Sequence, residues 1–124
     1  MVKFFLCEHC KNMVDMIFDS GVPMMCCGQK MTALVPNSVE AATEKHIPVV
    51  SISGNTVTVT VGSVLHPMLA EHHIAWIALE TTAGVYRKAL EAGKEPVAVF
   101  TLTDEKPITV YEFCNLHGLW KKDI

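Results

Sequence analysis

The chain has 124 residues and a formal net charge of −3, and 50% of its residues are hydrophobic. This length fits one ordinary domain, or one small domain followed by one of roughly 90 residues. The sequence has no basic stripe, which argues against a nucleic-acid partner, and no apolar run approaches a membrane span. The apolar run near the N-terminus, Phe4 to Leu6, is too short for a signal peptide, so the expected location is the cytoplasm.

Residues 1–35 carry a cysteine pattern, CEHC followed later by CCG. Cys-x-x-Cys spacing lets two thiolates reach one metal from a tight turn, and an adjacent pair can complete the set. Disulfides are disfavoured in a reducing compartment, and adjacent cysteines pair only with strain. A segment this short also needs staples or a metal to hold it together. The predicted ligands are Cys7, Cys10, Cys26 and Cys27, with iron and zinc both open at this point.

Residues 35–43, VPNSVEAAT, are typical of a linker. From Ile47 onward the hydrophobic period is two, which indicates strands. In IPVVSISGNTVTVTVG the alternation places the valines of TVTVTV on one face and the threonines on the other. Gly54-Asn55 predicts a hairpin turn between the two runs of this segment.

A second hairpin is predicted in HHIAWIALETTAGVYRKAL, with its turn near Ala83-Gly84. The end of this segment, VYRKALEAG, also fits a short helix that Gly93 would end. PVAVFTL and PITVYEF are two further runs rich in β-branched and aromatic residues. Short strands with turn signals at close intervals predict an antiparallel sandwich or barrel.

Histidines flank the predicted strands, and a last cysteine lies in a Cys-x-x-His turn; these residues are His46, His66, His72, His73, Cys114 and His117. One histidine at a strand end is weak evidence, but neutral imidazole is the commonest transition-metal ligand. His72 and His73 point to opposite faces of a regular strand, so only one should serve. Four imidazoles and one thiolate exceed what structural zinc uses, and they suit iron with an open sixth position. A thiolate opposite that position would push electron density toward it.

Taken in order, these motifs resemble the desulfoferrodoxins, the two-iron superoxide reductases, over essentially the whole chain. The paired cysteines resemble the family's four-cysteine site, and EKHIPV, GSVLHPM, EHHIAWI and CNLHG resemble its other ligand segments. The resemblance implies an all-β chain: a small desulforedoxin-like (rubredoxin-like) domain over residues 1–36, then an immunoglobulin-like antiparallel β-sandwich over residues 37–124. It also implies two iron ions per chain, one in each site, and a homodimer that takes electrons from a small donor such as rubredoxin.

The family's roles carry over to the matching positions. The implied equatorial ligands of the catalytic iron are His46, His66, His72 and His117, with Cys114 as the axial ligand. Glu44 and Lys45 match two mobile charged residues beside the open position. Lys45 is expected to draw in an anion, and Glu44 to reach the sixth position after oxidation. The implied reaction is reduction of superoxide to hydrogen peroxide without dismutation. On the residues alone, two other classes stay open: a small two-iron electron carrier and a zinc-stabilised binding module.

Overall fold

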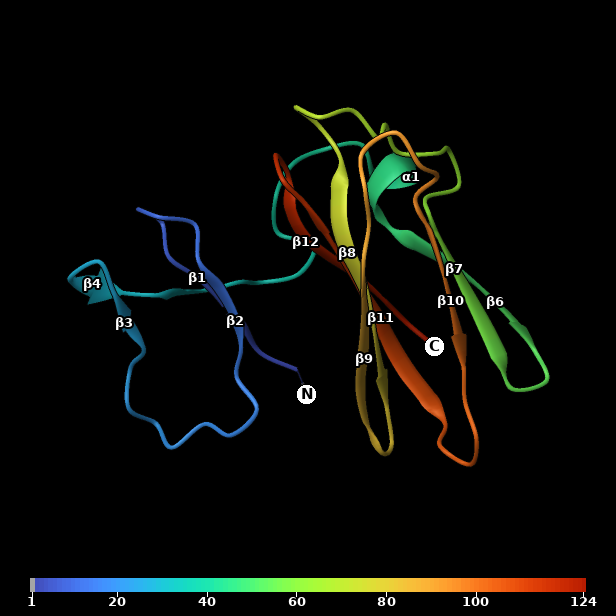
Figure 1. The fold of residues 1–124 in the computed structure, drawn as a ribbon, viewed down its shortest axis with the longest axis horizontal. Helices are drawn as coiled ribbons and strands as arrows, with labels where there is room; N and C mark the ends of the chain where they lie inside the picture. The colour runs from blue at the N-terminus through green and yellow to red at the C-terminus, as the bar shows by residue number, and fades with distance from the viewer. Residues whose placement is uncertain (1) are drawn as a thin grey trace. The chain divides into compact units, whose positions relative to one another are not determined.

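The computed structural model describes residues 2–124, and the chain divides into two compact units that meet between Val35 and Pro36. Both units are built from antiparallel strands (Figure 1), which confirms the predicted all-β class. Within residues 2–124, no helix is long and apolar enough to cross a membrane.

The first unit has short strands and few buried side chains. Its strands are β1 (Phe4–Leu6), β2 (Met13–Asp15), β3 (Met25–Cys26), β4 (Gln29–Lys30) and β5 (Thr32–Ala33). They form a three-stranded sheet in the order β2-β1-β5 and a separate β3-β4 hairpin. Among residues 2–35, the buried apolar residues are Phe4, Cys7 and Met31. So small a core gives little stability without a staple.

The second unit, residues 36–124, is a sandwich of antiparallel strands. They are β6 (Pro48–Ser53), β7 (Thr56–Val61), β8 (Ile74–Thr81), β9 (Gly84–Ala89), β10 (Val97–Thr101), β11 (Pro107–Cys114) and β12 (Gly118–Asp123). One sheet has the order β10-β7-β6 and the other β12-β11-β8-β9. Sheets of three and four strands match the immunoglobulin-like sandwich.

The valines of TVTVTV form one side of the core, as the alternation predicted. Val57, Val59 and Val61 are all at most 1% exposed and pack in the main apolar cluster, whereas the threonines between them are half-buried. Both predicted hairpin turns are present. Ser53 pairs with Thr56 across Gly54-Asn55, and β8 turns into β9 at Gly84.

One local alternative was wrong, and one short helix was not predicted. The segment proposed as a short helix, VYRKALEAG, begins with β9, because pairing with β8 along its whole length outweighs helix propensity. His46, which the sequence placed beside the first strand, lies in a one-turn helix, α1 (Thr43–His46), that precedes β6. Pro48 ends this turn, since a proline forces the preceding Ile47 into extended backbone.

The loop after β7 holds the α1 turn. Pro48 has no N–H to donate to the Glu44 carbonyl, and that carbonyl instead accepts from the Val64 N–H at 2.9 Å and the Ser63 hydroxyl at 3.2 Å. The backbones approach so closely that a Cβ at Gly62 would lie 2.6 Å from the Glu44 oxygen. Glycine is therefore required at position 62, and the turn that carries His46 is fixed from outside.

Candidate metal centres

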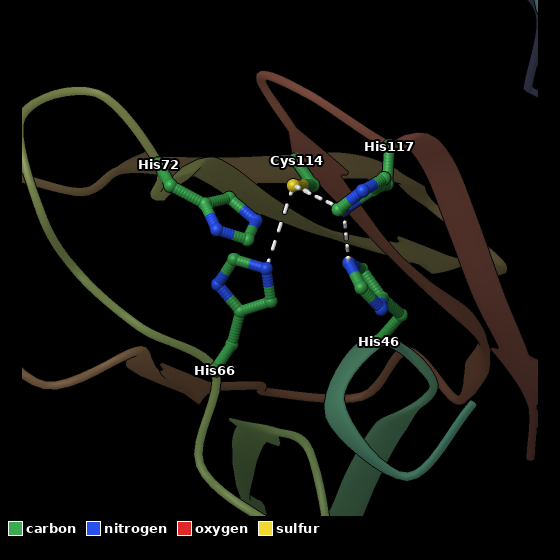
Figure 2. A group of neighbouring side chains, drawn as sticks. All are labelled: His46, His66, His72, Cys114 and His117. Atoms are coloured by element: carbon green, nitrogen blue, oxygen red, sulfur yellow. Dashed lines mark hydrogen bonds between the residues drawn. The ribbon is translucent and has the colours of Figure 1, made fainter. Parts of the chain in front are cut away.

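α1, the loop before β8 and the β11–β12 turn lie at one end of the sandwich (Figure 1). Five side chains from these segments converge there. The donor atoms of this histidine–cysteine cluster all lie within 4.8 Å of one another; its members are His46, His66, His72, Cys114 and His117. Figure 2 shows the four imidazoles and the sulfur pointing toward one another. The His46 Nε2 and His117 Nδ1 atoms are 3.1 Å apart, and the Cys114 sulfur is 3.4 Å from His66 Nε2. One cation fits between these donors.

Backbone carbonyls set which nitrogen faces the centre in two of the four rings. His46 Nδ1 lies 2.7 Å from the Ala42 oxygen, and His66 Nδ1 lies 2.7 Å from the Pro67 oxygen. A ring that donates its Nδ1–H in this way presents the lone pair of Nε2 to the cluster, as metal-ligating histidines do. His72 Nε2 is buried with no hydrogen-bond partner among residues 2–124. A buried orphan nitrogen is costly unless a cation occupies the centre.

Burial favours the neutral form of three of these rings, His46, His66 and His72. Desolvation is the main cause that lowers the pKa of His46, His66 and His72, and it brings that of His66 to about 4. Mutual repulsion between the imidazoles lowers these pKa values further. Neutral imidazole is the form that binds metals, so the site is prepared for a cation at neutral pH.

Burial and backbone hydrogen bonds also act on the Cys114 thiol. Burial raises the pKa of its thiol, and the backbone N–H groups of Leu116 and His117 oppose this rise by donating to the sulfur. A thiolate at this buried position therefore needs a cation beside it. These amides belong to the CNLHG turn, which ends at Gly118 with φ 81°.

The structure separates the two neighbouring histidines. His72 enters the cluster, whereas the His73 Nδ1 bonds to the Leu69 carbonyl at 3.0 Å and the His73 N–H donates to the Asn115 side chain at 2.9 Å. Both precede β8, which begins at Ile74, so the strand alternation expected for them does not apply. The turn around Leu69 and the Asn115 contact separate them instead.

The four remaining cysteines form a second cluster in the first unit, the four-cysteine cluster: Cys7, Cys10, Cys26 and Cys27. The Cys10 and Cys26 sulfurs are 3.6 Å apart, far beyond a disulfide bond, and all five cysteines are free. Cys27 and Gly28 both have positive φ, 54° and 75°, as the central residues of a tight hairpin turn require. That turn places the two adjacent sulfurs on one centre.

Hydrogen bonds within the four-cysteine cluster shift the pKa values of Cys7 and Cys27 in opposite directions. The Cys10 N–H is the main cause that lowers the pKa of Cys7 to about 6, while hydrogen bonding to the Cys10 thiol is the main cause that raises that of Cys27 to about 12. The amides of Cys10 and Asn12 point at sulfur atoms, each at 3.4 Å. Four sulfurs with amide donors suit a tetrahedral Zn²⁺ or iron ion.

The charged pair predicted beside the site lies on the α1 turn next to His46. The Glu44 and Lys45 side chains are exposed, and within the described part of the chain neither forms an ion pair. The Lys45 charge is close enough to contribute to the lowered pKa of His72, after the larger effects of burial and His117. A cation thus lies near the centre, free to meet an anion.

Sequence reasoning missed two residues beside the histidine–cysteine cluster. Trp120 is 2% exposed and stacks on the His46 ring. Glu112 is fully buried, and neither of its carboxyl oxygens has a hydrogen-bond partner among residues 2–124. Glu112 shares strand parity with the buried Val110 and Cys114, so the alternation in PITVYEFC carried that signal. No pattern in the sequence indicates that Trp120 stacks on His46.

Glu112→Gln is expected to flatten the pH dependence of unfolding. Burial raises the pKa of Glu112 from 4.5 to about 9. The folded state therefore keeps a proton that the unfolded state loses, so stability from this group is full below about pH 4.5 and is lost toward about pH 9. Relative to the variant, the wild-type free energy of unfolding should fall by up to about 1.4 kcal/mol per pH unit in this window.

Chemical denaturation of both proteins from about pH 5 to about pH 8 measures this difference. Protons linked to the metal sites are shared by the two proteins and cancel in the difference. Glu112→Leu should lose the same slope, because it also removes the carboxyl. Parallel wild-type and variant curves would contradict the prediction.

The fold and the two donor sets define a small β-protein with two mononuclear metal sites, one of four thiolates and one of four imidazoles and a thiolate. Comparison with known proteins agrees with this class. The desulfoferrodoxin family profile matches residues 38–123. The desulfoferrodoxin of Syntrophotalea carbinolica is 41% identical over 98% of this chain and 96% of its own length. The chain belongs to the desulfoferrodoxin family.

Solved structures show the same likeness. The match to the superoxide reductase of Treponema pallidum covers 99% of each chain, with a TM-score of 0.84 and 41% identity. The match to the 1Fe superoxide reductase of Giardia intestinalis covers 97% of that chain but 65% of this one, with a TM-score of 0.56 and 30% identity. About a third of this chain therefore has no counterpart in that shorter protein.

Proposed function

We propose that this chain is a superoxide reductase that converts superoxide to hydrogen peroxide without dismutation. One observation carries the proposal: four imidazoles and one buried thiol, drawn from segments far apart in the sequence, converge on one centre. Structural zinc takes four ligands and leaves no reason for a fifth. The similar solved structures are of superoxide reductases, which supports the same activity.

The reaction consumes one superoxide, one electron and two protons for each hydrogen peroxide formed. The ligands are His46, His66, His72 and His117 with Cys114, and bound ferrous iron would supply the electron. The Cys114 thiolate raises electron density at this site, and the amides of Leu116 and His117 limit that donation. The carbonyls of Ala42 and Pro67 keep two imidazoles oriented, so the chain need not reorganise during the reaction.

Lys45 and Glu44 act on the charge around the open position in this proposal. Superoxide is an anion and the chain carries a formal net charge of −3, so a local cation is needed to reverse the field near the site. Lys45 supplies it. Glu44 would act after oxidation: its exposed carboxylate would compete with outside anions for the centre, and it would take no part in the first encounter with superoxide.

The four-cysteine cluster holds the second iron in this proposal, within a domain of residues 1–36, and residues 37–124 form the catalytic domain. Cys7, Cys10, Cys26 and Cys27 are the ligands. A small rubredoxin-like protein supplies the electrons, the chain works as a homodimer, and the cytoplasm is its location. The free state of all five cysteines supports a reducing compartment.

Metal analysis together with a superoxide assay tests the proposed function. The purified chain should contain two iron ions and absorb visible light, which a zinc-stabilised binding module would not do. Pre-reduced protein mixed with superoxide should yield one hydrogen peroxide per superoxide consumed. Dismutation would yield half as much and release dioxygen. An electron carrier without this activity would leave superoxide decay at its uncatalysed rate.

Lys45→Ala is expected to slow the bimolecular reaction with superoxide by roughly tenfold, because the variant loses the cation that draws in the anion. The wild-type rate should fall as salt rises, and the variant should show a flatter salt dependence. Rapid mixing of reduced protein with superoxide at several ionic strengths gives both results.

Glu44→Ala is the matched control, since it removes the neighbouring charge from the same exposed turn. Its first encounter with superoxide should be nearly unchanged, while its oxidised form should bind azide more readily. An unchanged Lys45→Ala rate with the wild-type salt dependence would remove Lys45 from this role.

A further inference from the structure

Trp120 touches two of the proposed iron ligands at once. Its ring stacks on the His46 imidazole with the centroids 5.0 Å apart and the planes inclined by 27°. Its indole N–H donates to the His117 backbone carbonyl at 3.1 Å. The two histidines belong to α1 and to the β11–β12 turn, so one buried side chain links ligand-bearing segments that are distant in the sequence.

The His46 ring needs such support. α1 is a single turn, and Ala42 at its N-cap makes no side-chain capping bond. One turn of helix is marginal by itself. The Ala42 carbonyl fixes one edge of the imidazole, and the Trp120 face fixes its plane. The planes of the His46 and His117 rings are inclined by 89°, and His46 Nε2 lies 3.1 Å from His117 Nδ1.

The indole N–H bond reaches the other side of the centre. It fixes the His117 carbonyl within the turn whose amides, at Leu116 and His117, donate to the Cys114 sulfur. A shift of this turn would change those two hydrogen bonds and hence the electron donation of the thiolate. The two contacts of Trp120 therefore act on different ligands, the ring on His46 and the N–H on the thiolate turn.

We propose that Trp120 is a positioning residue of the histidine–cysteine centre, which orients His46 through its ring and the Cys114–His117 turn through its N–H. This inference rests on the proposed function only for the identity of the metal and the substrate. The contacts themselves are between residues of this chain, and they predict effects on metal retention and absorption that can be measured without superoxide.

Trp120→Leu removes both contacts. The histidine–cysteine centre should then lose its metal to a ferrous chelator roughly 10- to 100-fold faster, the usual effect of losing a residue that orients a ligand. Trp120→Phe keeps a stacking ring and lacks the N–H. It should retain metal nearly as well as wild type, but shift the sulfur-to-iron charge-transfer absorption of the oxidised centre. The split between retention and absorption is a result that a merely structural role would not give.

Trp76 is the matched control, because the chain has two tryptophans and Trp76 stacks on Phe113, which is outside the cluster, with the ring centroids 6.0 Å apart. Trp76→Leu should leave chelation rate and absorption unchanged. In the Trp76→Phe protein, Trp120 is the remaining tryptophan. Its emission should be quenched by bound iron and recover on chelation, since it contacts a ligand.

Equal metal loss in Trp120→Leu and Trp76→Leu, or wild-type behaviour of Trp120→Leu, would overturn the inference. If Trp120→Leu does not fold, the Trp120→Phe variant tests the inference. An unshifted charge-transfer band in Trp120→Phe would overturn the role of the indole N–H. Failure of the proposed function would look different, because wild-type protein would then not consume superoxide whatever the Trp120 variants do to metal retention.

Discussion

Cys114→Ser is expected to stop superoxide reduction while the first unit stays folded with its iron bound. A serine hydroxyl in place of the thiol would remain protonated and donate little electron density, and the buried position gives it no other partner of the right charge. Losing even a residue that only orients a ligand costs up to about 100-fold, so loss of the thiolate itself should cost at least that much in the rate with superoxide.

The absorption spectrum and the superoxide assay, run on the same sample, check this result. The charge-transfer band of the oxidised histidine–cysteine centre should disappear, and the bands of the four-cysteine site should persist. His73→Ala is a suitable control, because His73 bonds to the Leu69 carbonyl and stays outside the cluster. A Cys114→Ser protein that kept wild-type activity would exclude the sulfur from the reaction.

The sequence allowed much of the sandwich to be predicted because its signals are local. Alternation in TVTVTV and the Gly54-Asn55 pair each specify a strand face or a turn within a few residues. The donor residues were also visible, since histidine and cysteine types at strand ends are few. Which of them meet is a tertiary property, and here the family resemblance, not periodicity, singled out His72 over His73.

What the sequence did not reveal depends on contacts between distant segments. α1 is a single turn, too short for a periodic signal, and its Glu44 carbonyl accepts hydrogen bonds from Ser63 and Val64 of a distant loop. β9 was ambiguous because VYRKAL suits a helix until β8 pairs with it. The stack of Trp120 on His46 requires both the register of β12 and the direction of α1, and neither can be inferred from spacing.

Cys7→Ser is expected to unfold residues 2–35 and leave the sandwich intact. The first unit buries few apolar side chains besides Cys7 itself, and Cys7 is 1% exposed. Metal binding in so small a domain supplies most of its folding free energy. Loss of one thiolate, and of the hydrogen bond from the Cys10 N–H to it, should therefore release the metal and the strands together.

Limited proteolysis with trypsin and amide exchange measure this local unfolding. Cleavage should begin at Lys3, Lys11 or Lys30, while lysines of the sandwich stay protected as in wild type. The Cys114→Ser variant is the reciprocal control, because it alters the other site and should keep the first unit protected. If Cys7→Ser kept full protection of residues 2–35, the metal would not be what holds this unit.

The activity of the Cys7→Ser protein tests whether the two sites are independent. Superoxide reduction by the pre-reduced variant should persist, since the histidine–cysteine cluster lies wholly within residues 36–124. If the variant lost the reaction while retaining the absorption of the histidine–cysteine centre, the two sites would be coupled rather than independent.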